Sequence, residues 1–168
     1  MTEERIVILG IGCTLYADQG FGVHVVQELE RRYDLPDHVL VVDGGLVGVG
    51  LTGVVAGARH VIAVDAMRSN GRPGDMYRLE GAQILQRLTT KNQIQQVEFL
   101  EALAHCQALD RPPEAVLLAA EPEDTRSLAF ELTPPLARAL DPMIAQVLAE
   151  LDRLGVHYTS KGTGAACA

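Results

Sequence analysis

Short runs of apolar, often β-branched residues recur along the chain, and each ends at a glycine, an aspartate or a turn. Runs of this kind are typical of strands that are buried on both faces of a parallel sheet. A shorter run before Gly81 is expected to lie antiparallel to its neighbours. The pattern predicts strands at residues 5–10, 38–42, 60–64, 76–79 and 115–120.

Segments with apolar residues three or four positions apart separate these strands. Val23, Val26 and Leu29, for example, would fall on one face of a helix. Pro134 and Pro135 are expected to open the last helix, because proline suits a first helical turn. A helix after Gly48 would be short and weakened by its glycines. Helices are predicted at residues 23–33, 48–55, 94–106 and 134–154.

Strands that alternate with helices indicate a mostly parallel sheet with helices on both faces. The expected fold class is therefore α/β, a three-layer α/β/α sandwich around a twisted sheet of about five strands. No linker, repeat or low-complexity block interrupts the sequence, so residues 1–158 are expected to form a single domain. Residues 159–168 are small and polar, and we expect them to form a disordered tail.

The composition narrows the possible partners and the compartment. With 14 basic and 22 acidic residues the chain has a formal charge of −8, which argues against nucleic acid and against an anionic membrane surface. The N-terminal apolar run is too short for a signal peptide or a membrane span. The three cysteines form no CxxC pair, which fits a reducing compartment. We expect a soluble, cytoplasmic protein.

In parallel α/β folds, ligands bind at the carboxyl ends of the strands. Three loops leave those ends: a glycine-rich loop after the first strand, Asp43 with two glycines after the second, and Asp65 after the third. Carboxylates at such positions can bind a metal or polarise a substrate, but they can also cap the following turn. Asp65 is the stronger functional candidate, since the two glycines after Asp43 favour a turn. None of the five histidines falls in these loops, so the residues do not predict a histidine-rich metal site.

The glycine-rich loop allows two interpretations. Gly10, Gly12, Gly20 and Gly22 resemble a dinucleotide-binding fingerprint, which would make the protein a small-molecule enzyme. However, the third glycine of GxGxxG would stand where this chain has Leu15. The favoured interpretation is that the glycines permit tight backbone turns.

Read in order, several stretches resemble the [NiFe]-hydrogenase maturation endopeptidase family. GIGCTLYADQGFG is similar to its N-terminal signature, VVDGG to its DGG turn, and HVIAVDAM to a strand that ends in a key aspartate. RPGDMYRLEG, QQVEFLEAL and LTPPLARALDPMIAQVLAEL resemble later segments of the family. The resemblance extends over residues 5–156, nearly the whole chain, and it implies the same α/β/α sandwich.

The resemblance also implies an activity. Members of this family are aspartic-type endopeptidases that remove a short C-terminal extension from a nickel-loaded [NiFe]-hydrogenase large-subunit precursor. The nickel would come with the substrate rather than stay bound to the protease. It would be recognised by an acidic residue in the glycine loop, the strand-end aspartate and a histidine.

At these three positions this chain has Gln19, Asp65 and Gln95. Amide oxygens are weaker nickel ligands than carboxylates and imidazoles. Asp18, next to Gln19, is a possible substitute ligand, and Glu98 and Asp43 are further candidates. For catalysis the expected residue is Asp65, with Asp43 as a second carboxylate, in a metal-assisted hydrolysis of a peptide bond.

The two glutamines leave three explanations open. They could be engineered replacements that inactivate a protease. They could belong to a natural homologue that binds the hydrogenase subunit without cutting it. In the third explanation, the chain is an active protease whose ligands have shifted to neighbouring positions.

Overall fold

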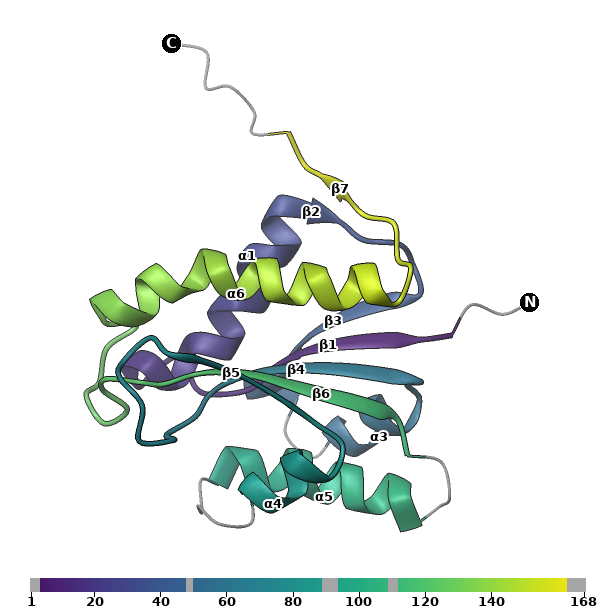
Figure 1. Cartoon of the computed structure of the whole chain (residues 1–168), viewed down its shortest axis with the longest axis horizontal. Coiled ribbons are helices and arrows are strands. Elements are labelled where there is room, and N and C mark those ends of the chain that lie inside the picture. Colours follow the sequence, from purple (N-terminus) through teal and green to yellow (C-terminus); the bar gives the residue numbers. More distant parts are fainter. Residues whose placement is uncertain (1–3, 48–49, 89–93, 109–111, 163–168) are drawn as a thin grey trace.

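A central sheet of five strands organises the molecule (Figure 1). The computed structural model describes residues 4–47, 50–88, 94–108 and 112–162; within these ranges it does not describe the side chains of residues 46, 47, 87, 88 and 94–98. Four strands are parallel and the fifth, at one edge, is antiparallel, as the sequence predicted. The spatial order is β3 (Val39–Asp43), β1 (Ile6–Gly10), β4 (His60–Ala66), β6 (Glu114–Ala120) and β5 (Met76–Glu80).

Helices cover both faces of the sheet, so the expected three-layer sandwich is confirmed (Figure 1). One layer contains α1 (Phe21–Arg32) and α6 (Pro134–Arg153). The other contains α3 (Leu51–Ala56), α4 (Ala82–Leu88) and α5 (Ile94–Ala108). Two one-turn elements, η1 (Ala17–Gly20) and α2 (Gly44–Val47), follow the carboxyl ends of β1 and β3.

Alternation along the strands divides the core in two. In β4, Ile62 and Val64 pack in the layer of α1 and α6, whereas Val61 and Ala63 pack in the layer of α3 and α5. Because successive side chains of a strand point to opposite faces, this assigns a face to every position along the strand. Burial of each large aliphatic side chain contributes about 1.5–3 kcal/mol. Because side chains are buried on both faces of the sheet, the strands appear in the sequence as continuous apolar runs.

The C-terminal segment and the region after β5 differ from the sequence prediction. Thr159–Ser160 form strand β7, which pairs antiparallel with β2 (Tyr33–Asp34). The prediction of a disordered tail was therefore wrong for these two residues. The pairing occurs because the chain turns back after α6, where the ring of Tyr158 meets that of Tyr33 edge to face at 5.8 Å. Residues 163–168 lie outside the described residues. Helix α4 was also missed, because seven residues are too few for a clear helical period.

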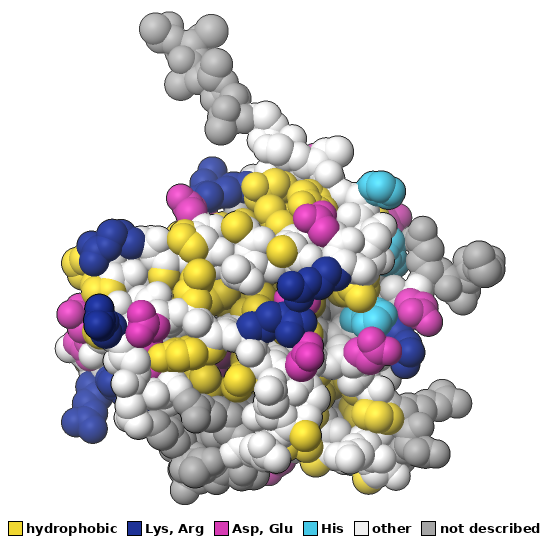
Figure 2. Space-filling model, in the orientation of Figure 1, with side chains coloured by type: hydrophobic (Ala, Val, Ile, Leu, Met, Phe, Trp, Pro, Cys, Tyr) yellow, Lys and Arg dark blue, Asp and Glu magenta, His cyan; other side chains and the backbone are white. Residues whose placement is uncertain are grey.

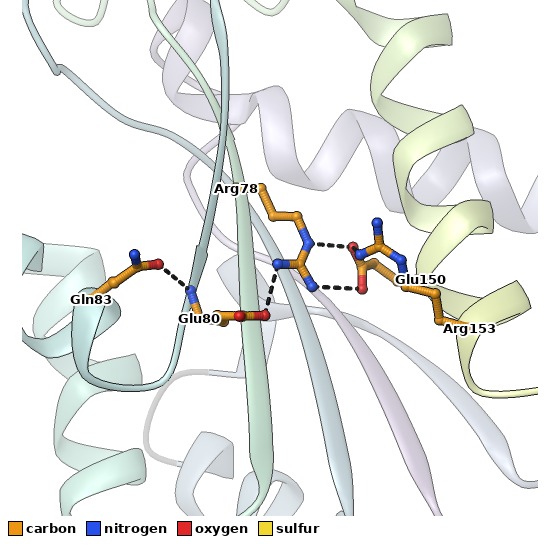
Figure 3. Close-up of polar contacts among 5 residues, drawn as sticks. All are labelled: Arg78, Glu80, Gln83, Glu150 and Arg153. Atoms are coloured by element: carbon orange, nitrogen blue, oxygen red, sulfur yellow. Dashed lines mark hydrogen bonds and ion pairs between the residues drawn. The ribbon is translucent and has the colours of Figure 1, made fainter.

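The antiparallel edge strand is tied to α6 by charge. Arg78 on β5 donates from Nε to Glu150 Oε1 at 2.6 Å and from Nη2 to Glu150 Oε2 at 3.2 Å. Arg153 reaches the same carboxylate at 2.8 Å, and Glu80 accepts from Arg78 at 2.7 Å (Figure 3). The two arginines compensate the nearly complete burial of Glu150.

No helix within the described ranges is long and apolar enough to cross a membrane.

Candidate functional site

The three loops expected to form a site do meet at one end of the sheet. Strand β1 lies between β3 and β4, and Gly10 at its carboxyl end is in register with Asp43 on one side and Val64 on the other. Asp43 and Asp65 therefore flank the glycine-rich loop. The loop's 3-10 turn, η1, packs against β4. The topology thus places Asp43, Asp65 and the glycine-rich loop at the same end of the sheet.

The glycines of this loop allow backbones to pack closely. A Cβ added at Gly22 would overlap the carbonyl oxygen of Val64 and the backbone of Ile11. Gly12 has a φ of +130°, and a Cβ there would overlap the carbonyl oxygen of Gln19. The first turn of α1 thus lies directly on the strand ends. Both glycines therefore have the role that the favoured interpretation gave them, which is to permit tight turns and close backbone packing.

Asp65 is a buried carboxylate at the end of β4, with 4% of its surface exposed. By strand alternation it points to the same face as Val61 and Ala63, toward the layer of α3 and α5. Its Oδ1 accepts a hydrogen bond of 2.7 Å from the backbone N–H of Ala66, which fixes the orientation of the carboxylate. A buried, oriented carboxylate at a strand end is suited to hold a metal ion or a proton.

Asp43 points to the opposite face. It has the same parity as Val39 and Val41, which pack in the layer of α1 and α6. Its Oδ1 accepts from Gly45 N at 3.0 Å and its Oδ2 from Gln27 Nε2 at 3.4 Å. These contacts make Asp43 the cap of the turn into α2. The geometry does not pair it with Asp65, contrary to the expected second catalytic carboxylate.

Asp18 is fully buried, and its carboxylate joins two loops. Oδ2 accepts from the backbone N–H groups of Glu123 and Asp124, both at 2.9 Å. Oδ1 accepts from Thr133 N at 2.8 Å, and the Thr133 hydroxyl lies within 3.0 Å of both oxygens. With both oxygens engaged in this way, the geometry argues against Asp18 as a substitute metal ligand. Its observed role is to hold the glycine-rich loop against residues 121–133.

Gln19 is held by the same neighbouring loop. Its Nε2 donates a 2.8 Å hydrogen bond to the carbonyl oxygen of Thr125. Because a carbonyl oxygen can only accept, the atom that faces it must be the amide nitrogen. Gln19 can therefore offer Oε1, a neutral oxygen, to a ligand.

Gln95 and Glu98 lie near the start of α5, the helix that covers the face to which Asp65 points. Their side chains are outside those that the structure describes, so their expected roles as ligands stay predictions. Among the residues that are described, no group of three or more His, Cys, Asp or Glu side chains is arranged to hold a metal ion.

A buried carboxylate that the sequence analysis missed follows β6. Oε2 of Glu121 accepts hydrogen bonds from Ser69 N at 2.6 Å, Gly71 N at 3.2 Å and the hydroxyl of Tyr77 at 3.0 Å. Burial and the bond to Glu121 raise the pKa of Tyr77. Glu121 therefore shapes the loop that follows Asp65. Glu121 directly follows the predicted strand at residues 115–120, as Asp65 follows the predicted strand at residues 60–64, and this position was the available signal.

The chain resembles known proteins in sequence and in fold. A family model described as hydrogenase maturation protease matches residues 23–150. The hydrogenase expression/formation protein HupD of Bradyrhizobium diazoefficiens is 36% identical over 154 residues, which is 88% of this chain and 80% of that protein. The hydrogenase 2 maturation protease of Escherichia coli is 33% identical, over 90% of this chain and 93% of its own length.

Solved structures agree with these matches. The hydrogenase maturating endopeptidase HybD of Escherichia coli superposes with a TM-score of 0.88 at 33% identity, covering 94% of this chain and 98% of that one. A [NiFe] hydrogenase maturation protease from Thermococcus kodakarensis shares the fold, with a TM-score of 0.71 at 19% identity, over 88% of this chain and 98% of its own. The resemblance drawn from the sequence motifs is confirmed, and the chain belongs to the hydrogenase maturation protease family.

Proposed function

We propose that this protein is a cytoplasmic endopeptidase that removes the C-terminal extension of a nickel-loaded [NiFe]-hydrogenase large-subunit precursor. The observation that carries the proposal is the position of Asp65. It is a buried and oriented carboxylate at a strand end, beside the glycine-rich loop and facing the layer of α5. Family membership supports peptide-bond hydrolysis as the reaction.

In this proposal Asp65 does the main chemical work. As a carboxylate it can ligate the substrate's nickel, or accept a proton from the water that attacks the peptide bond. The Oε1 of Gln19 supplies a weaker, neutral contact from the glycine-rich loop. Gln95 would supply another from α5. A set with one charged donor favours nickel that arrives with the substrate over nickel held by the free protease.

The test is cleavage of a purified large-subunit precursor, followed by mass spectrometry. We expect the nickel-loaded precursor to lose the mass of its C-terminal extension, while the nickel-free precursor, as the matched control, keeps its full mass. An intact nickel-loaded precursor after prolonged incubation would contradict the proposal. Equal cleavage of both forms would contradict the role of nickel.

One observation favours a second candidate, a homologue that binds the precursor without cutting it. The hydrogen bond from Gln19 Nε2 to Thr125 O is one that a carboxylate cannot make. Gln19 thus fits its own surroundings, which suits a site that has diverged from the family's nickel ligands.

The double substitution Gln19→Glu with Gln95→His separates the two candidates. Under the binding-only alternative, the unaltered protein binds the precursor and leaves it intact, and the doubly substituted protein gains cleavage. Cleavage by the unaltered protein rules this alternative out.

A further inference from the structure

Four large apolar side chains project into solvent beside the candidate site. They belong to Leu15, Tyr16, Leu128 and Phe130, and they are 49%, 39%, 78% and 65% exposed. We name this set the apolar rim. Exposure of a single leucine needs no explanation, but a group of large apolar side chains on adjoining loops is typical of a surface that binds a partner.

The rim is held by backbone hydrogen bonds rather than by burial. Tyr16 and Ala129 form a parallel bridge between the two loops. Ala17 N donates to Ala129 O at 2.7 Å, and Ala129 N donates to Leu15 O at 3.2 Å. The Nε2 of His24 on α1 donates to Phe130 O at 3.1 Å. The rim is therefore organised before anything binds, which lowers the entropy cost of binding.

The rim continues into the candidate site through the same two loops. Tyr16 lies three residues before Gln19, and Leu128 lies three residues after Thr125, the residue that holds the Gln19 amide. A polypeptide that is cut at this site must extend to both sides of the bond that breaks. One side of it can cross the rim.

Charge does not dominate this end of the molecule. Arg68 and Arg126 are exposed here, but so are Glu123 and Glu131. Figure 2 shows basic, acidic and apolar side chains interleaved at the end where the loop after β6 lies in Figure 1. With both signs present, apolar contact has to supply most of the affinity for a partner.

We infer that the apolar rim binds an extended, apolar segment of the large-subunit precursor next to the bond that is cut. The inference rests on the proposed function and names the part of the surface that selects the substrate. The partner's segment would place apolar side chains against Leu128 and Phe130. The affinity of the apolar rim for this segment would depend only weakly on salt concentration.

The test measures affinity separately from cleavage. The substitution Asp65→Asn is introduced into every protein, so that bound precursor is not consumed, and binding to immobilised nickel-loaded precursor is recorded by biolayer interferometry. The rim variant carries Leu128→Ser and Phe130→Ser. The matched control carries Leu40→Ser, which removes an exposed leucine on β3, outside the apolar rim.

The parent is the protein that carries only Asp65→Asn. We expect the rim variant to bind the precursor at least about tenfold more weakly than this parent, and the control to bind it with the same affinity as the parent. Equal affinity of rim variant and parent overturns the inference and leaves the proposed function standing. If neither this parent nor the protein with Asp65 intact binds the precursor, both fail. Rim-dependent binding without cleavage by the unaltered protein supports the rim and contradicts proteolysis.

A second measurement tests whether the rim binds the precursor or something else, and it does not depend on how the rim variant folds. Hydrogen exchange of the protein with the unaltered rim, with and without precursor, should show protection of residues 13–17 and 127–131 on binding. Absence of protection overturns the inference. Concentration-dependent self-association that disappears in the rim variant would assign the rim to a second copy of this chain, and would also overturn it.

Discussion

Asp18 and Gln19 are neighbours in the chain, but their side chains have different partners. The carboxylate of Asp18 is buried against the backbone N–H groups of the loop after β6, whereas the amide of Gln19 faces a carbonyl oxygen. A carboxylate can only accept hydrogen bonds and an amide nitrogen can only donate them. Each side chain is therefore matched to its partners, and exchanging their chemistry should destabilise the protein.

Asp18→Asn tests the first of these matches. One oxygen is replaced by an NH₂ group, which would face N–H donors and lose their hydrogen bonds. We expect the free energy of unfolding to fall by about 2–4 kcal/mol in urea denaturation. Asp37→Asn, at an exposed position, is the control and should change it by less than about 0.5 kcal/mol. An Asp18 variant as stable as the control would contradict the assigned role.

Gln19→Glu tests the second match and has a defined pH dependence. The new carboxylate would face the Thr125 carbonyl oxygen, which disfavours its charged form and raises its pKa in the folded state. The loss of stability, about 1 kcal/mol, should be present at neutral pH and should disappear as the pH falls through that raised pKa. Thermal unfolding at pH 7 and pH 4.5 measures this. A loss of stability, relative to the unaltered protein, that grows as the pH falls toward 4.5 would contradict the expected pH dependence.

At the scale of single elements, the contacts of α1 and β5 explain why they occupy their positions. Helix α1 starts directly on the strand ends because Gly22 has no side chain. Strand β5 is held to α6 by Arg78 and Glu150, which are 72 residues apart in the chain. Sequence periodicity predicted both elements but neither contact.

Gly22→Ala should be strongly destabilising. The added methyl group would meet the backbone of Ile11 and Val64, neither of which can move without distorting the sheet. We expect a loss of about 3 kcal/mol or more. Gly53→Ala is a matched control, because its added Cβ in α3 has no described heavy atom within 4 Å apart from its chain neighbours and the backbone of its own helix. That variant should gain about 0.5–1 kcal/mol, since alanine favours the helix. Equal effects of the two substitutions in chemical denaturation would contradict the packing of α1.

Glu150→Gln should reduce stability in a way that depends on pH. Burial tends to raise the pKa of Glu150, but hydrogen bonds and charges from Arg78 and Arg153 outweigh it and hold the pKa below its ordinary value of 4.5. The contribution of the carboxylate is therefore complete above about pH 4.5 and is lost as the pH falls through the lower folded value.

We expect a loss of about 1–3 kcal/mol at pH 7, shrinking in acid. Glu80→Gln removes the exposed partner of Arg78 and should cost less than about 1 kcal/mol. Denaturation curves at pH 7 and pH 3.5 test both variants. A Glu150→Gln penalty that is unchanged at pH 3.5 would show that its charge does not stabilise the fold.

At the scale of the whole molecule, the strand order brings Asp65, the glycine-rich loop and α5 to one end of the sheet. The sequence predicted this end correctly, because parallel strands point their carboxyl ends the same way. It did not predict on which face of the sheet each carboxylate lies. Asp43 and Asp65 lie on opposite faces of the sheet, and that follows from their parity with Val41 and Ala63.

Other features could not be predicted from local patterns. The partners of Asp18 are 105–115 residues away along the chain, and the pairing of Thr159–Ser160 with β2 depends on where α6 ends. Such contacts form only when the complete fold is present. By contrast, Glu121 directly follows a predicted strand, as Asp65 does in the sequence prediction, and this position alone could have identified it.

If Asp65 carries the reaction, removing its charge should slow cleavage without unfolding the protein. Asp65→Asn keeps the shape of the side chain and removes its charge, while Asp43→Asn makes the same change on the opposite face. The measurement is the initial rate at which the nickel-loaded precursor loses its extension, followed by mass spectrometry, with thermal unfolding to verify that both variants fold. We expect Asp65→Asn to slow cleavage by about 10²-fold or more and Asp43→Asn to have a far smaller effect. Cleavage by a folded Asp65→Asn variant at the unaltered rate would show that Asp65 does not carry the reaction.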